Sequence, residues 1–319
     1  MRQIFTDGLA FAMPLLLMAL GALYSEKSGV TNLAIEGFQG VGAFFGALAA
    51  TLLTPALGAG NQSIIYLAMV CAALGGALFS CIHGLLCIRF QANQVISGVV
   101  INILAVALTA FFTSAANSAI TGSASNKFVL DVSVRFTVPL LSAIPLLGGL
   151  FTDMYPFEVI IAVLALFLWY LMNRTRFGMR LRACGENPQA VDAAGANVIG
   201  IRWVAVLISG ALSGVGGMCF AYSLVGNFSP SIYQGFGYLA IAAMIFGNWN
   251  IGPTVLACLF FGIAKAAGLQ LCIAAQLPSS YTDLFLMLPY VLTLLLLVFF
   301  SRKNHPPKAA GEPWDKGKR

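Results

Sequence analysis

The stretch PFEVIIAVLALFLWYLMNRTRFGMRLR, residues 156–182, decides the fold class of this chain. Its first part, 156–173, is almost entirely apolar and is close to the length of about 20 residues that one helix needs to cross a bilayer. Four arginines follow at once: Arg174, Arg176, Arg180 and Arg182. Arginines that cluster directly after a spanning helix mark the cytoplasmic side of the membrane. The stretch therefore predicts a transmembrane helix that ends in a basic cytoplasmic loop.

Similar apolar segments occur on both sides of this stretch. They predict one all-α, polytopic membrane domain, residues 1–301, with eight to ten spans, because an open backbone cannot be hydrogen-bonded in lipid. Two of the segments, 38–53 and 236–250, are short and rich in glycine, so each is a candidate half-helix. The apolar segments are 8–24, 38–53, 64–88, 94–113, 156–173, 201–225, 236–250, 253–272 and 284–301.

The composition excludes a soluble protein. Of the 319 residues, 59% are hydrophobic and 9% are charged, and the mean hydropathy is +0.89. A soluble domain carries roughly 25% charged residues, because its surface must face water. The net charge of +6 does not indicate a nucleic-acid surface, since the basic residues gather in the loop after residue 173 and in the tail 302–319.

The two basic segments set the expected orientation. The loop 174–200 and the tail 302–319 are expected in the cytoplasm. The stretch 114–155 is then expected on the periplasmic side, packed as short surface helices. The side of the N-terminus depends on whether one short segment truly spans, so both possibilities stay open.

Polar side chains within the apolar segments are the candidate functional residues, because burying them in lipid is costly. Asn32, Glu36 and Gln39 share one helical face if this stretch is helical. They either line or gate a pathway, or Glu36 lies at the membrane surface and caps the helix that it opens. The glycines that follow Glu36 resemble those at 235–237, and paired glycine-interrupted short segments are typical of substrate sites built from broken helices.

A second polar stripe lies on the segment 94–113. Its side chains either line a pathway or form hydrogen bonds between helices. Lys265 has three possible roles: an ion pair with Glu36, contact with an anionic group, or reaching to the membrane interface. The members of the stripe are Asn102, Thr109, Thr113 and Asn117.

Other small or polar side chains in the spans favour structural roles. Ser209, Ser213 and either Gly216 or Gly217 form a small-residue stripe that favours close helix packing. His83 has no carboxylate at helical spacing, so a core histidine with satisfied hydrogen bonds is favoured over a functional one.

The motifs of most enzymes are missing from the sequence. It has no G-x-x-x-x-G-K-[ST] loop, so this chain is not expected to hydrolyse ATP. It also lacks G-x-S-x-G and H-E-x-x-H. Its seven cysteines include no C-x-x-C pair, and it has two histidines. We therefore expect no catalytic residue, metal site or cofactor in the chain itself.

Three sequence blocks carry a family resemblance. They are NLAIEG (32–37), RTRFGMRLRACGENP (174–188) with its continuation AAGANV (193–198), and GYLAIAAMIFGNW (237–249). In this order they resemble permease subunits of bacterial ABC importers for nucleosides and simple sugars. One departure is Ala196, where the family often has isoleucine. The length and the pair Glu36–Gly37 look closest to the shorter permease of nucleoside importers of the basic-membrane-protein type.

The resemblance implies a subunit of a larger machine in the bacterial cytoplasmic (inner) membrane. Its partners would be a second, related or identical permease, a cytoplasmic ABC ATPase that binds ATP and Mg²⁺, and an extracytoplasmic substrate-binding lipoprotein. The implied substrate is a nucleoside or a related ribosyl or ribityl compound, with riboflavin or a simple sugar as alternatives. An ion-coupled secondary transporter is the weaker class, because few intramembrane charges exist. The candidate pathway residues are Asn32, Glu36, Gln39, Asn102, Thr109 and Asn248.

A short coupling helix is predicted at residues 185–195, where the chain would dock on the ATPase. Asn187 suits the N-cap of this helix, and Pro188 suits its first helical position. Gly195 can end the helix in a left-handed conformation. A helix of barely two turns is unstable alone, so it needs a partner surface, to which Val191 and Ala194 would give apolar contacts. The alternative is a solvated loop. The predicted coupling residues are Arg182, Gly185, Glu186, Asn187, Pro188, Gln189, Val191 and Ala194.

Overall fold

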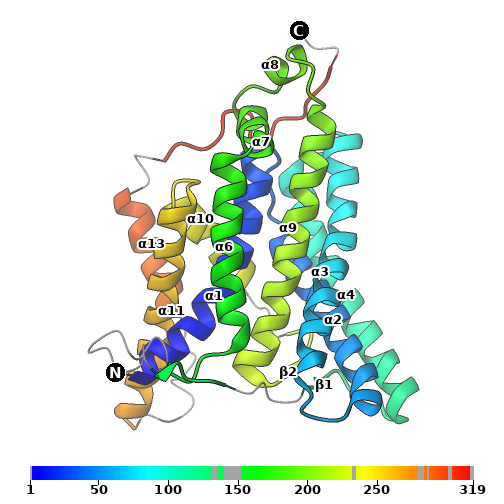
Figure 1. Ribbon diagram of the computed structural model, residues 1–319, viewed down its shortest axis with the longest axis vertical. Helices are drawn as coiled ribbons and strands as arrows, with labels where there is room; N and C mark the ends of the chain where they lie inside the picture. The colour runs from blue at the N-terminus through cyan, green and yellow to red at the C-terminus, as the bar shows by residue number, and fades with distance from the viewer. Residues whose placement is uncertain are drawn as a thin grey trace.

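The computed structural model describes residues 2–130, 135–139, 152–231, 235–276, 278, 284–285, 287–300 and 304–316. Within these residues the chain forms a bundle of long helices that run roughly along one axis (Figure 1). The helices are α1 Arg2–Lys27, α2 Ile35–Leu57, α3 Gln62–Gly84, α4 Gln94–Thr121, α6 Pro156–Arg174, α7 Arg176–Glu186, α8 Pro188–Ala193, α9 Val198–Phe220, α10 Phe236–Phe246, α11 Ile251–Ala274 and α13 Leu288–Phe300.

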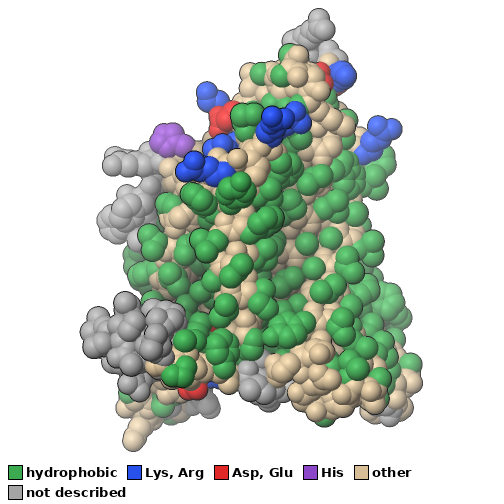
Figure 2. Space-filling view, viewed as in Figure 1, with side chains coloured by type: hydrophobic (Ala, Val, Ile, Leu, Met, Phe, Trp, Pro, Cys, Tyr) green, Lys and Arg blue, Asp and Glu red, His purple; other side chains and the backbone are tan. Residues whose placement is uncertain are grey.

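Seven of the described helices are long and apolar enough to cross a membrane. They are α1, α2, α3, α4, α6, α9 and α11, and π-helical turns extend α3 to Arg89 and α9 to Val225. The space-filling view shows apolar side chains over the face of the bundle that is turned toward the viewer (Figure 2). The all-α polytopic fold predicted from the sequence is confirmed.

Of the two candidate half-helices, only one is short. The segment predicted at 38–53 is a full helix of 23 residues, α2. Its glycines do not break it, because neighbouring helices pack directly on them: a Cβ added to Gly42 would lie 2.2 Å from the Cα of Gly214. The segment predicted at 236–250 contains α10, which has 11 residues. It begins after Gly235, whose φ of +81° ends any helical path, and it is followed by a turn in which Asn248 also has a positive φ.

The centre of the bundle is α1, which is almost completely buried, and it packs mainly on α9 and α11. Around it, α2, α3 and α9 meet through small residues. A Cβ added to Gly76 would lie 2.2 Å from the carbonyl oxygen of Gly210, and one added to Gly217 would lie 2.3 Å from that of Gln39. The close packing predicted for the small-residue stripe is therefore confirmed, since a larger side chain there would collide with backbone.

The two ends of the bundle differ in charge. Lys and Arg side chains gather at the end that carries α7 and α8, which we call the basic end (Figure 2). At the opposite end, β1 (Phe128–Val129) pairs antiparallel with β2 (Asn227–Phe228), and Phe136 forms an isolated bridge with Met154. Part of the predicted surface-helix stretch is therefore extended, and the portions at 131–134 and 140–151 lie outside the described residues.

Candidate functional site

The short helix α10 begins inside the bundle. Its 11 residues rise about 16 Å, roughly half of the 30 Å hydrocarbon core. Its far end reaches the basic end, because Asn248, two residues after it, accepts a hydrogen bond from the backbone of His305 at 2.7 Å. The N-terminus of α10 thus lies near the middle of the bundle, half-buried at Gly235 and Phe236, and its free N–H groups need acceptors there.

Glu36 supplies one of these acceptors. Its Oε1 accepts a hydrogen bond from the N–H of Gly235 at 2.9 Å. The start of α2 and the start of α10 pack closely here, since a Cβ added to Gly237 would lie 2.6 Å from the Cβ of Glu36. The carboxylate also faces the positive end of the α10 dipole. Of the two alternatives for Glu36, capping of its own helix is not seen, because its hydrogen bond goes to the start of α10; a pathway role stays a prediction.

The two glycine-containing stretches that resemble each other in sequence therefore meet in space. The resemblance between the residues after Glu36 and those at 235–237 was a weak signal for this contact. Gln234, the first residue of the second stretch, lies outside the described residues.

Asn102 and Asn32 fix the start of α2 on its neighbours. The Oδ1 of Asn102 accepts from the N–H of Gly37 at 2.8 Å, and its Nδ2 donates to the carbonyl of Leu33 at 2.8 Å and to the hydroxyl of Tyr238 at 3.0 Å. Asn32 donates to the Oγ of Ser209 at 3.0 Å. The contacts of Asn102 match the interhelical hydrogen bonds that were one of the two alternatives for its stripe. A pathway role for both residues stays a prediction.

The remaining candidate pathway residues lie in three different surroundings. Gln39 is fully buried and its amide has no hydrogen-bond partner among the described residues. Thr109 donates to the carbonyl of Ala105 at 2.7 Å and borders an apolar cavity of about 370 Å³ between α2, α3 and α4. Asn248 lies at the basic end, bonded to His305. The structure brings Asn32, Glu36 and Asn102 together, and it places Asn248 away from them.

Lys265 and His83 are both accounted for by contacts within the chain. The Nζ of Lys265 lies 3.9 Å from the ring centroid of Phe11 and 4.2 Å from that of Phe236, which is a cation–π arrangement. No ion pair with Glu36 occurs among the described residues, so this predicted role is not seen. His83 lies 3.0 Å from the Oγ of Ser97 and is a satisfied core histidine, as predicted.

At the basic end, two short helices replace most of the predicted loop 174–200. Thr175 caps α7, accepting from the N–H of Gly178 at 3.2 Å. Gly185 and Glu186 form the last turn of α7, so the predicted helix 185–195 begins too early in the chain. The Oδ1 of Asn187 accepts from the N–H of Ala190 at 3.0 Å and caps α8.

The boundaries of α8 otherwise follow the prediction. Pro188 is its first residue, and Gly195 follows it with a φ of +78°. Val191 does not face outward: it is buried against Cys184 and Val198 of its own chain. The outward surface is formed by α8 and its flanks. Its exposed residues are Arg182, Glu186, Asn187, Gln189, Ala190, Ala193 and Ala194.

Sequence reasoning missed the residues that complete these sites. Tyr238 joins the Asn102 network, and Trp249 donates from its indole N–H to the buried Glu26. Trp314, in the C-terminal tail, packs on the same apolar cluster as Val191. None of these contacts has a local sequence signal, because each joins distant segments.

A bundle of seven long apolar helices among the described residues, with a short helix inside it and capped short helices at its basic end, is the arrangement of a polytopic membrane protein. The chain belongs to the family described as the permease component of branched-chain amino acid transport systems, whose model matches residues 4–297. It is thus a multi-pass membrane protein and one component of a transport system.

Two of the similar proteins cover nearly the whole chain, and a third covers most of it. It is 38% identical to the guanosine ABC transporter permease protein NupQ of Bacillus subtilis, over 98% of this chain and 96% of the relative. It is 37% identical to the nucleoside ABC transporter permease protein NupC of Lactococcus lactis, over 100% of this chain and 98% of the relative. A putative glucose ABC transporter permease of Haloferax volcanii is 31% identical to it, over 80% of this chain and 74% of the relative. No solved structure gives a significant match.

Proposed function

We propose that this chain is a transmembrane subunit of an ABC importer for nucleosides in the bacterial inner membrane. The observation that carries the proposal is the likeness, over essentially the full length, to two permeases that are named for guanosine and nucleosides. The putative glucose permease is less similar and covers less of the chain. A simple sugar is therefore the second candidate, and riboflavin the third.

The surroundings of Glu36 support a neutral substrate. The N-terminus of a broken helix commonly binds an anionic substrate group within a membrane. Here that position already holds the carboxylate of Glu36, which accepts from Gly235. The ammonium group of Lys265 lies against the rings of Phe11 and Phe236. A nucleoside carries hydroxyls and a flat base without charge, so it needs neither group.

The partners that we propose follow from the transporter class. A cytoplasmic ABC ATPase, which binds ATP and Mg²⁺, docks on α8 at the basic end. A second permease packs against the apolar circumference, and an extracytoplasmic lipoprotein delivers the substrate at the opposite end. An exposed helix of six residues at the basic end supports the first of these assignments.

Uptake by the reconstituted importer tests the substrate. Vesicles that contain this chain, its partner permease, the ATPase and the binding protein are expected to accumulate labelled guanosine only with ATP. Unlabelled nucleosides should compete, and glucose and riboflavin should not. The control is the same complex with the phosphate-loop lysine of the ATPase replaced. Uptake of glucose or riboflavin with no competition from nucleosides would reject the assignment.

Cysteine labelling tests the orientation. We expect the basic end to face the cytoplasm, so a membrane-impermeant maleimide added to intact cells should miss Gln189→Cys and label Asn126→Cys. Both positions are exposed; Gln189 belongs to α8 and Asn126 lies two residues before β1, and these two elements are at opposite ends of the bundle (Figure 1). Because α1 begins at the end opposite α8 (Figure 1), the N-terminus is then expected outside. If Gln189→Cys is labelled in intact cells and Asn126→Cys is not, the orientation is the reverse of the one expected here.

A further inference from the structure

The C-terminal segment 304–316, which we call the strap, lies across the basic end of the bundle and does not extend freely from it (Figure 1). The described residues of the strap form turns and stretches without regular secondary structure. It contains three prolines and few apolar residues, a composition that does not fold alone. Its ordered path therefore depends on contacts with the rest of the chain.

Hydrogen bonds tie the strap to five separate parts of the basic end. They reach the turn before α11, the last turn of α7, the link after α1, the start of α9 and the link before α4. The bonds are His305 N to Asn248 Oδ1 at 2.7 Å, Ala309 N to Gly185 O at 2.8 Å, Gly311 N to Gly29 O at 3.3 Å, Arg202 Nη1 to Glu312 O at 3.1 Å, and Gln91 Nε2 to Trp314 O at 3.2 Å.

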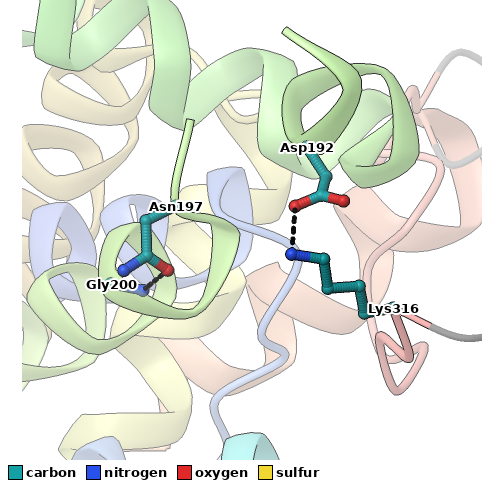
Figure 3. Close-up of polar contacts among 4 residues, drawn as sticks. All are labelled: Asp192, Asn197, Gly200 and Lys316. Carbon is teal, nitrogen blue, oxygen red and sulfur yellow. Dashed lines mark hydrogen bonds and ion pairs between the residues drawn. The ribbon is translucent and has the colours of Figure 1, made fainter. Parts of the chain in front are cut away.

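The last residues of the strap contact α8. Trp314 packs against the buried cluster of Cys184, Val191 and Val198. The Nζ of Lys316 forms an ion pair with the Oδ1 of Asp192 at 3.8 Å (Figure 3). The lysine side chain is 77% exposed, so this ion pair contributes little compared with the packing of Trp314.

The other side of α8 is attached through the start of α9. The Oδ1 of Asn197 accepts from the N–H of Gly200 at 3.0 Å and caps that helix (Figure 3). A helix of six residues has no stability of its own, so its orientation depends on these attachments. The strap covers the inward face, and Gln189, Ala190 and Ala193 stay exposed.

We propose that the strap is a positioning element of the coupling unit: it holds α8 in the orientation in which its exposed face docks on the ATPase. This inference rests on the proposed function, because it assumes an ATPase partner. The inference gives the strap a structural role in coupling. The basic residues of the tail 302–319, taken alone, would only mark the cytoplasmic side of the membrane.

Two truncations test the strap. A stop codon at Asn304 removes it, and a stop codon at Gly317 removes only the last three residues, including two basic ones, as the matched control. In the full complex, hydrogen exchange of the peptide that covers 188–196 is expected to become at least about tenfold faster without the strap. ATP-driven guanosine uptake should fall by roughly 5- to 150-fold, the usual range of coupling between sites. The control should match the intact chain in both assays.

Point variants keep the test decisive if the shorter chain does not reach the membrane. Trp314→Ala is expected to change exchange and uptake in the same direction, and Lys316→Glu is expected to leave both nearly unchanged. Normal exchange in α8 after loss of the strap, or of the Trp314 indole, would overturn the inference. If the intact complex transports no nucleoside, the proposed function fails, and the exchange measurement still decides the role of the strap.

Discussion

Replacing Glu36 with alanine is expected to abolish uptake and to lower the stability of the permease. The substitution leaves the N–H of Gly235 without its acceptor inside the bundle, which costs about 1–3 kcal/mol. It also removes the negative charge that faces the α10 dipole, worth up to about 2 kcal/mol in a partly buried site. Thermal unfolding of the purified permease and ATP-driven uptake in vesicles measure the two effects.

Three further variants separate the cap from other roles of Glu36. Glu36→Gln keeps an oxygen that can accept from Gly235, so it should lie between the native chain and the alanine variant. Gly237→Ala should be as damaging as Glu36→Ala, because its Cβ would lie 2.6 Å from that of Glu36. Gly252→Ala is the matched control, since a Cβ there meets nothing within 4 Å. Normal uptake and stability of both Glu36→Ala and Gly237→Ala would refute the cap.

Breaking α8 is expected to uncouple ATP hydrolysis from transport without affecting membrane insertion. Ala190→Pro removes the N–H that donates a hydrogen bond to the Oδ1 of Asn187. It also disfavours the helical conformation of Gln189, the residue before the new proline. Uptake should fall by roughly 5- to 150-fold, the range expected for loss of coupling between sites. Ala190→Ser, which changes the side chain at the same position but keeps the N–H, should transport far better than Ala190→Pro. The amounts of permease and of co-purified ATPase show whether docking, rather than insertion, is lost.

Crosslinking identifies the face of α8 that docks. A cysteine at the exposed Gln189 or Ala193 is expected to crosslink to the ATPase, and one at the buried Val191 is not. The native Cys184 nearby should not interfere, because burial raises the pKa of its thiol and keeps it from solvent. Equal crosslinking at 189 and 191, or none at 189 and 193, would reject this docking face.

The helical spans and the caps of α8 were predictable because they depend on neighbouring residues only. A run of about 20 apolar residues must cross the bilayer as a helix. Likewise, Asn187, Pro188 and Gly195 lie within one short segment, and each acts on backbone groups a few residues away. The family blocks, which are also local strings, identified the permease class.

Only the tertiary structure decided what the buried polar groups contact. Glu36 and Gly235 are 199 positions apart, and no periodicity relates them, so the sequence could offer only a cap on its own helix or a pathway role for Glu36. Val191 was predicted to contact a partner, because a helix of barely two turns is unstable alone and needs an apolar surface to pack on. Val191 is buried because Cys184 and Val198, seven residues away on either side, fold against it and Trp314 joins them from the C-terminal segment. Apolar length and capping are properties of one segment, whereas the partner of a buried group depends on how all the helices pack.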